Sequence, residues 1–408
     1  MRHRTIDGPR LEGWPWPADL DAPSIGEPAF SHSVRIRGWV ALPKNCVMDG
    51  VALVVDKQHI NLGFMDRSDV ERGFPSRQVV GFTGFIPVTN DRVNTDWKIE
   101  LVVDGQKFIT PARVSPSLQA LDDFRTARSL RLERIEPILR CPALSTSENL
   151  SLACGGLLVR RETELVCQKC GNSWPATDGF DFLSNELRKL AATTETEAVS
   201  SWGYDPFAEE IIARADGELV LDAGAGCKPG DRLEVVNLEV ARYPSTDVLA
   251  PSESLPFAND SFAAALSLTV LEHVRDPARC VGELARVVRP GGSLYVVVPF
   301  LQPYHGYPGH YFNMSHDGLA TLLEPYFDIE QAGTPPFGWP IWTLTWFLNR
   351  YLVGLPETDR VKFRSLTVDQ LLAVGFDYLG EDFVQNLSES SRTELASVNY
   401  AIAVQEPS

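Results

Sequence analysis

Short β-rich runs alternate with turn signals through the first third of the chain. Val34–Val40 and Ile99–Val103 are two such runs, and Asp104-Gly105 is a hairpin signal between Ile99–Val103 and Lys107–Ile109. Strands of this length and spacing predict a β-sandwich over residues 25–115.

The pattern then changes over residues 116–136, where apolar side chains are interspersed with Arg and Asp. An apolar stripe with charged residues between its members predicts an amphipathic helix that links two domains. The apolar positions are Leu118, Leu121, Phe124, Leu130 and Ile135.

Residues 196–408 show a third pattern, in which apolar runs alternate with other elements. This predicts an α/β domain with a largely parallel, seven-stranded sheet. Six residues separate Val240 from Asp247, too few for a crossover helix, so the first half of the sheet should be trimmed. The predicted strands are Leu219–Asp222, Val235–Val240, Asp247–Ala250, Ala264–Leu268, Ser293–Val298, Phe327–Glu330 and Val398–Val404.

An insertion is predicted at about 335–390, before the last strand. It contains an aromatic stretch, Phe337–Val353, with three tryptophans, and a helical pattern over Val361–Phe376. The aromatic stretch is interpreted as a helix packed on the domain or on a second subunit, which would make a homo-oligomer. A lid over an acceptor pocket and a peripheral membrane contact through 337–353 are the alternatives.

Composition restricts the classes of partner. Thirty-seven Lys+Arg against 54 Asp+Glu give a net charge of −17, which disfavours a broad phosphate-binding surface, so no nucleic acid partner is expected. No apolar run reaches membrane-spanning length and the first residues lack a signal-peptide core, so a cytoplasmic protein is expected. Seven cysteines without a secretion signal do not suggest a disulfide framework.

Four of the cysteines lie within residues 137–186. Cys167 and Cys170 have the spacing that lets two thiolates of a tight turn bind one tetrahedral zinc ion, whereas twelve residues separate Cys141 from Cys154. With the flanking Cys154-Gly-Gly-Leu157 and Trp174–Leu183, the segment resembles the zinc-ribbon module related to the activator subunit of eukaryotic tRNA and protein methyltransferases. The resemblance implies a structural Zn²⁺ bound by all four thiolates, with an insertion in the first knuckle. Buried reduced cysteines are the alternative.

A glycine loop follows the first strand of the α/β domain. Asp222 ends the strand, and Gly224 and Gly226 let a ligand lie against the backbone. The loop lacks the third glycine and the helix of a dinucleotide-binding fingerprint, which argues against a nicotinamide cofactor. Glu239 ends the second strand, where a carboxylate can accept hydrogen bonds from both hydroxyls of a ribose.

Four motifs in order resemble the class I S-adenosyl-L-methionine-dependent methyltransferases of type 11. They are Val220–Gly226, Leu255–Phe262, Val270–Val274 and Arg286–Gly292. The resemblance implies that Gly224 and Gly226 line the methionine moiety, that Glu239 binds the ribose, and that Ser252, Glu253 and Leu255 border the adenine. Asp222 would face the methionyl ammonium, and Ser267 and Leu268 the reacting methyl. Pro251 stands where the family often has an acidic residue, a role that Glu253 would have to fill.

The segment Tyr304–His316 follows the fifth strand and is rich in histidine and aromatic residues. Since ligands bind at the carboxyl ends of parallel strands, His310, slightly preferred, or His305 is the candidate general base. The alternative is that both only shape the pocket. Glu272 and His273, within the third motif, are interpreted as structural.

The acceptor is predicted from the first domain. Arg37-Gly-Trp39, Arg67–Val70 with Phe74-Pro75, and Gly84-Phe85 resemble β-sandwich modules of bacterial glycosyltransferases and methyltransferases of surface-glycan assembly. This implies a role in polysaccharide biosynthesis, with methyl transfer to a sugar hydroxyl of a surface glycan, nucleotide sugar or glycolipid. An RNA base methyltransferase and a non-catalytic methyltransferase-like scaffold are the rival hypotheses.

Overall fold

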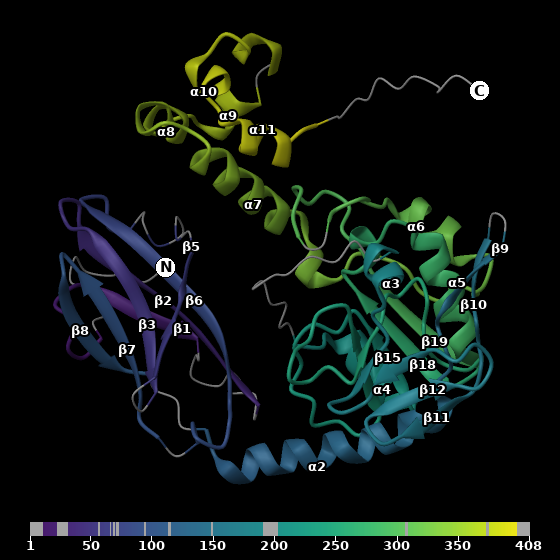
Figure 1. Ribbon diagram of the computed structural model, residues 1–408. Coiled ribbons are helices and arrows are strands. Elements are labelled where there is room, and N and C mark those ends of the chain that lie inside the picture. Colours follow the sequence, from purple (N-terminus) through teal and green to yellow (C-terminus); the bar gives the residue numbers. More distant parts are fainter. Residues whose placement is uncertain are drawn as a thin grey trace.

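The amino-terminal part of the chain is β-rich. The computed structural model describes residues 11–22, 32–55, 58–65, 67, 70, 73–93, 95–112, 116–147, 150–190, 203–306, 309–372 and 375–397. Two four-stranded antiparallel sheets, in the orders β1-β2-β6-β5 and β4-β3-β7-β8, share one apolar core (Figure 1). The strands are β1 (Ala18–Ala22), β2 (Ser33–Pro43), β3 (Met48–Val55), β4 (Gln58–Asn61), β5 (Gly63–Met65), β6 (Arg77–Pro87), β7 (Trp97–Val103) and β8 (Gln106–Pro111).

The predicted Asp104-Gly105 turn is confirmed. It joins β7 to β8 with Val103 paired to Gln106. Both turn residues have positive φ, 49° and 73°, as a two-residue turn with the twist of the flanking strands requires.

Helix α2 (Leu118–Ile135) connects the β-rich part to the rest of the molecule and runs beneath both in Figure 1. The Ser117 side chain accepts a hydrogen bond from the Ala120 amide and so caps the first turn. Leu121 and Phe124 belong to the core of the β-rich part, whereas Ile135 belongs to the core around the parallel sheet. One helix is thus buried at its two ends in two different cores.

The cysteine-containing segment forms two small antiparallel sheets after the 3₁₀ helix η1 (Glu136–Ile138). A hairpin of β9 (Leu144–Ser147) and β10 (Leu150–Ala153) lies between Cys141 and Cys154 and accounts for their wide spacing. The second sheet contains β11 (Leu158–Arg161), β12 (Glu164–Cys167) and β13 (Ser173–Pro175).

The carboxy-terminal half contains a six-stranded parallel sheet, in the order β14-β17-β16-β15-β18-β19 within the described residues. Five predicted strands are found in it, as β15 (Val220–Ala223), β16 (Val235–Glu239), β17 (Val248–Leu249), β18 (Phe262–Leu268) and β19 (Val288–Val297). The sixth, β14 (Phe180–Asp181), comes from the end of the cysteine-containing segment. The chain leaves β15 in one direction for β16 and β17 and in the other for β18 and β19, so the carboxyl ends of β15 and β18 flank a topological switch point.

Both faces of this sheet are covered. Val220 packs with Ala208 and Ile212 of α4 (Pro206–Arg214), whereas its neighbour Leu221 shares a core with Leu284 of α5 (Pro277–Val287). No helix lies between β15 and β16 or between β16 and β17, which confirms the predicted trimming.

One expectation about the last two strands is wrong and the other is not tested. Phe327–Glu330 is not a strand, because Phe327 packs instead against the cluster around Leu271 and Val281. Val398–Val404 lies outside the described residues.

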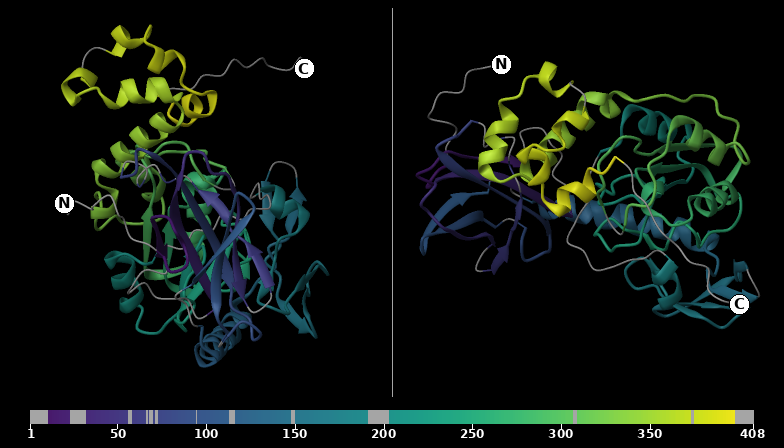
Figure 2. Two further views of the ribbon diagram at one scale, coloured as in Figure 1. Left: turned by 90° about the vertical axis from the view of Figure 1, so that its left-hand side faces the viewer. Right: turned by 90° about the horizontal axis from the view of Figure 1, so that it is seen from above.

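Helices α7 to α11 form a unit that rises above the sheet in Figure 1 and in the left view of Figure 2. Val361–Phe376 is not one helix, because α8 ends at Arg364 and the capping box of Thr367 starts α9. The helices not introduced above are α3 (Asn185–Leu190), α6 (His316–Leu323), α7 (Pro340–Val353), α8 (Glu357–Arg364), α9 (Val368–Leu371), α10 (Asp382–Gln385) and α11 (Glu389–Glu394), with the 3₁₀ helices η2 (Leu271–His273), η3 (Pro336–Gly338) and η4 (Gly375–Tyr378).

Helix α7 is largely exposed, although it carries the predicted aromatic stretch. Leu352 is its one buried residue, and Ile341 and Trp342 are 67% and 52% exposed. The helix therefore does not pack on the sheet as a buried element. Across the described part of the chain, no helix combines the length and apolar character needed to cross a membrane.

Candidate active site

The glycine loop leaves the carboxyl end of β15 at the switch point. Gly224 and Gly226 have φ values of 81° and 66°, a conformation that glycine adopts without steric cost. A Cβ atom on Gly224 would lie 2.4 Å from the Val270 side chain. The loop therefore depends on glycine both for its conformation and for its packing against the residues after β18.

Glu239, at the end of β16, holds this loop in place. Its carboxylate accepts hydrogen bonds from the amides of Gly226 at 2.9 Å and Val240 at 2.7 Å. Burial raises the pKa of Glu239, and these amides oppose the shift. Glu239 thus supports the loop directly, in addition to the ligand contact predicted for it.

Asp222 lies beneath the loop and is 1% exposed. Its carboxylate accepts a hydrogen bond of 2.7 Å from the Tyr204 hydroxyl, and the Lys228 ammonium lies 4.4 Å from the centre of the Tyr204 ring. Burial raises the pKa of Asp222, whereas Lys228 and Tyr204 lower it. Sequence reasoning missed both partners. Lys228 is a charged residue in a loop of small side chains and could have been noticed, but Tyr204 carries no local signal.

The three residues predicted to border the adenine differ in their surroundings. Ser252 and Glu253 line the cavity described below, whereas Leu255 is buried outside it and donates its amide hydrogen to Glu283. Glu253 is 2% exposed, and its Oε1 has no hydrogen-bond partner among the described residues. Burial raises the pKa of this carboxyl group. A buried oxygen without a partner at a cavity wall can accept a hydrogen bond from a ligand amino group.

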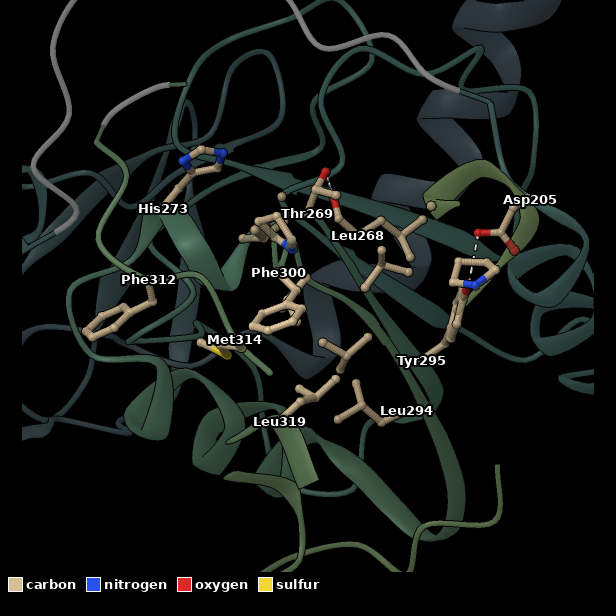
Figure 3. A pocket seen from close by; sticks show the side chains of 18 of the residues that line it. Asp205, Leu268, Thr269, His273, Leu294, Tyr295, Phe300, Phe312, Met314 and Leu319 are labelled. Carbon is tan, nitrogen blue, oxygen red and sulfur yellow. Dashed lines mark hydrogen bonds between the residues drawn. The ribbon is translucent and has the colours of Figure 1, made fainter. Parts of the chain in front are cut away.

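One cavity of about 3100 Å³ extends along the carboxyl ends of the strands and over β19. Asp222, Gly224, Glu239 and Leu268 line it, whereas Gly226 and Ser267 do not. Figure 3 shows Leu268, Thr269 and His273 at one wall and Phe300, Phe312 and Met314 at another. Thr269 has a φ of 56°, which is unusual for a β-branched residue and marks backbone strain beside the switch point.

Three histidines meet in this cavity. His310 accepts the amide hydrogen of His305 at Nδ1, 3.0 Å away, so its Nε2 carries the proton and donates to Asn313 at 2.8 Å. His305 donates from Nδ1 to the Pro303 carbonyl at 2.8 Å, and its Nε2 retains a lone pair. Among the described residues His305 Nε2 has no hydrogen-bond partner, whereas both ring nitrogens of His310 are engaged.

The third histidine, His273, joins this group together with Glu272. His273 donates from Nδ1 to the Gly309 carbonyl at 2.6 Å, and its ring centre lies 5.4 Å from that of His305. Burial lowers the pKa of His273 to about 4 and raises that of Glu272 to about 8. Burial also lowers the pKa of His305. The lowered pKa values favour the neutral form of His273 and His305 near pH 7.

Comparison with known proteins identifies the domain. A family described as a methyltransferase domain matches residues 232–296. An uncharacterized methyltransferase of Mycolicibacterium vanbaalenii is 39% identical over 178 residues, which cover 35% of this chain and 68% of that protein. The chain belongs to the methyltransferase family.

Two other matches cover less than half of the matched protein. The demethylmenaquinone methyltransferase of Renibacterium salmoninarum is 32% identical over 113 residues, or 24% of this chain and 47% of that protein. The chain thus spans about half the length of that relative. A solved phosphoethanolamine N-methyltransferase of Haemonchus contortus is 14% identical, with a TM-score of 0.26 over 46% of this chain and 48% of that one. A score this low supports no inference about the acceptor.

The family match includes Glu239, Glu253 and Leu268 but neither the four clustered cysteines, Cys141 to Cys170, nor the histidines after β19. The carboxyl end of β15, with Asp222 and Gly224, also precedes the matched residues.

The four cysteines converge as predicted. Their sulfur atoms all lie within 4.8 Å of one another, and the Cys141–Cys170 and Cys154–Cys167 pairs are 3.6 and 3.8 Å apart. Bonds of about 2.3 Å to one tetrahedral zinc ion would place sulfur atoms about 3.8 Å apart. A Cβ atom on Gly156 would lie 2.6 Å from the Cys167 sulfur. The donor set and its spacing therefore fit a closed zinc site.

Proposed function

We propose that this methyltransferase transfers a methyl group from S-adenosyl-L-methionine to a sugar hydroxyl of a surface glycan, nucleotide sugar or glycolipid. The observation that carries the proposal is the continuous cavity that extends from the glycine loop to the histidine and aromatic wall. One wall has the groups that an adenosyl ligand needs. The other has groups suited to a polar acceptor with apolar faces.

The residues of the first wall fit the cofactor. Gly224 leaves the backbone uncovered, Glu239 ends the strand where a ribose would lie, and Glu253 has a buried oxygen without a partner. These features support methionine, ribose and adenine contacts, in that order. When bound, the cofactor supplies an electrophilic methyl group on a sulfonium.

The contribution of the chain to the reaction is alignment and proton removal. In-line displacement is accelerated mainly by holding the acceptor oxygen in line with the methyl group. The loss of the hydroxyl proton needs an acceptor at the second wall. His305 suits this task better than His310, because its Nε2 lone pair is free.

A sugar fits the second wall because it presents both hydroxyl groups and apolar CH faces. The aromatic rings of Tyr304, Tyr311 and Phe312 line this part of the cavity. The net charge of −17 disfavours an RNA acceptor.

The first test is calorimetric titration with S-adenosyl-L-methionine, followed by methyl transfer from labelled cofactor to a panel of sugars, nucleotide sugars and RNA. We expect saturable binding and label in a carbohydrate. Absence of binding heat at high protein concentration would show a scaffold, and label in RNA alone would refute the sugar acceptor.

We also propose that Cys141, Cys154, Cys167 and Cys170 bind a structural Zn²⁺. The sulfur spacing supports this assignment. A closed four-thiolate site leaves no open coordination position, so it stabilises the segment and takes no part in the chemistry.

Helix α7 is a candidate for contact with a membrane surface that carries a lipid-linked acceptor. The support is its exposed apolar surface, with Trp339, Ile341 and Leu344 each more than half exposed. Co-sedimentation with anionic vesicles should fall in Ile341→Ser. If sedimentation is unchanged and the protein is dimeric in the ultracentrifuge, the surface serves a second copy instead.

A further inference from the structure

Three side chains converge beside the cavity: His273 and His305 line it, whereas Glu272 is buried and does not. Glu272 and His273 lie on η2, after β18, and His305 lies in the segment after β19. One donor atom from each lies within 4.8 Å of the other two, and His273 Nε2 is 3.7 Å from Glu272 Oε1. Two imidazoles and a carboxylate are a common ligand set for divalent transition metals.

Glu272 gives independent evidence for a missing partner. Its side chain is fully buried, and neither carboxylate oxygen has a hydrogen-bond partner among the described residues. Buried carboxylates are normally paired, hydrogen-bonded or bound to a metal, because an uncompensated charge is costly in the interior. The two buried oxygens of Glu272 are thus in a position that a cation would stabilise.

The tautomers of the two histidines also favour ligation. Each donates its Nδ1 hydrogen to a backbone carbonyl, His273 to Gly309 and His305 to Pro303, which leaves the lone pair on Nε2. A ring N–H bound to a carbonyl is the usual outer contact of metal-bound histidine and fixes the orientation of the ring. His310 accepts the His305 amide hydrogen and so positions this ligand without joining the set.

We propose that Glu272, His273 and His305 bind one divalent transition metal ion. Bonds of about 2.1 Å put neighbouring donors about 3.0–3.4 Å apart, so the three atoms must approach by less than about 2 Å. Adjustments of the Glu272 and His305 side chains that keep the His305 Nδ1 hydrogen bond to Pro303 would have to supply this movement. Three protein ligands leave coordination positions open toward the cavity.

The role of the ion rests on the proposed function. An acceptor hydroxyl bound at an open position would have a lowered pKa and would release its proton to water. The oxygen then forms its bond to the methyl carbon as the carbon–sulfur bond breaks, and that electron pair stays on sulfur. The ion would take the place of His305 as the activating group.

The metal can be tested without any acceptor. The four-cysteine site is first filled with zinc, and the full-length protein is then titrated with Co²⁺ by calorimetry and absorption spectroscopy. We expect one further equivalent without thiolate-to-cobalt charge-transfer bands. Binding should weaken at least about 100-fold in both Glu272→Gln and His305→Asn, and His316→Asn, an exposed histidine nearby, is the matched control. Circular dichroism checks that the variants are folded.

The outcomes of these experiments distinguish a failure of the metal site from a failure of the proposed methyl transfer. No second equivalent, or equal affinity in the wild type and both variants, overturns the metal site even if methyl transfer is observed. A second equivalent without methyl transfer to any acceptor leaves the site standing and refutes the proposed function. Undiminished methyl transfer after the ion is removed would show that His305 acts as a metal-free base and would overturn the catalytic role.

Discussion

Replacement of Arg131 by Met tests how the segment after the glycine loop is supported. Arg131 lies on α2, is fully buried, and donates two hydrogen bonds of 2.7 and 2.9 Å to Asp247, at the start of β17. Its Nη1 also donates to the carbonyls of Gly230 and Arg232, at 3.1 and 2.8 Å. Both carbonyls belong to the segment after the glycine loop. Arg131→Met keeps the apolar stem and removes all four hydrogen bonds.

The expected loss of folding free energy follows from the Asp247 carboxylate, which stays buried without its main partner. Removing one partner of a buried ion pair typically costs about 3–5 kcal/mol, because the other charge stays buried. The Asp247 carboxylate would keep the Asn237 amide at 2.9 Å and the Arg128 guanidinium at 3.7 Å. We therefore expect the lower end, about 3 kcal/mol, or roughly a 150-fold change in the unfolding equilibrium.

Arg134 is a matched control. It lies on the same helix and donates to the carbonyls of Leu233 and Gly217 at 3.1 and 2.7 Å, but within the described part of the chain it pairs with no carboxylate, and those bonds are exposed. Arg134→Met should cost no more than about 1 kcal/mol. The two variants thus differ mainly in burial and in the charged partner.

Hydrogen-exchange mass spectrometry is the suitable assay, since a chain with several cores need not unfold in one step. Peptides from β16 and β17 should lose protection in Arg131→Met, whereas peptides from β2 and β6 should not. The double variant Arg131→Met/Asp247→Asn should be less destabilised than the sum of the two single variants. If Arg131→Met matches Arg134→Met, the ion pair does not support the loop.

Three further predictions concern the loop, the cysteines and pH. Glu239→Ala should weaken S-adenosyl-L-methionine binding by at least about 10-fold, because the Gly226 and Val240 amides lose their acceptor. Near-native affinity by calorimetry would show that the glycine loop keeps its conformation without the Glu239 carboxylate. Cys167→Ser should lose one equivalent of zinc in elemental analysis and lower the melting temperature, and a retained equivalent would place the ion elsewhere. Burial lowers the pKa of His32 to about 4, below about 6.5 in the unfolded chain, so acidification from pH 7 to 5 should remove about 2 kcal/mol of stability. His32→Gln should lack this part of the loss; an identical pH dependence in both proteins would contradict the burial of His32.

Features set by neighbouring residues could be predicted from the sequence. The positive φ values of Asp104, Gly105, Gly224 and Gly226 follow from local turn chemistry. The missing helix after β16 follows from chain length, and the one after β15 from the absence of a helical pattern in the glycine loop and the residues that follow it. Both features depend only on residues that are neighbours in the chain, so the local sequence is enough to predict them.

Features set by distant residues could not be predicted in this way. β14 joins the sheet through the pairing of Phe180 with Val248, and periodicity does not show which strand edge accepts which segment. Phe327 lies in a segment with the apolar pattern of a strand, but its side chain packs in the cluster around Leu271 and Val281. The grouping of Glu272 with His305 and the engaged nitrogens of His310 depend on how the segment after β19 folds back over η2.

The trimmed sheet explains why the β-rich part and α2 contact the segment after the glycine loop. Buried backbone carbonyls must be hydrogen-bonded, and after β15 no helix provides partners within the segment. The Lys228 carbonyl accepts from His32, beside β2, at 2.7 Å, and the Gly230 carbonyl accepts from Arg131 of α2. The first contact joins residues 196 positions apart and the second residues 99 positions apart. The β-rich part and α2 therefore take over the hydrogen bonding of a missing crossover helix, and changes in either should alter cofactor affinity without touching the cavity.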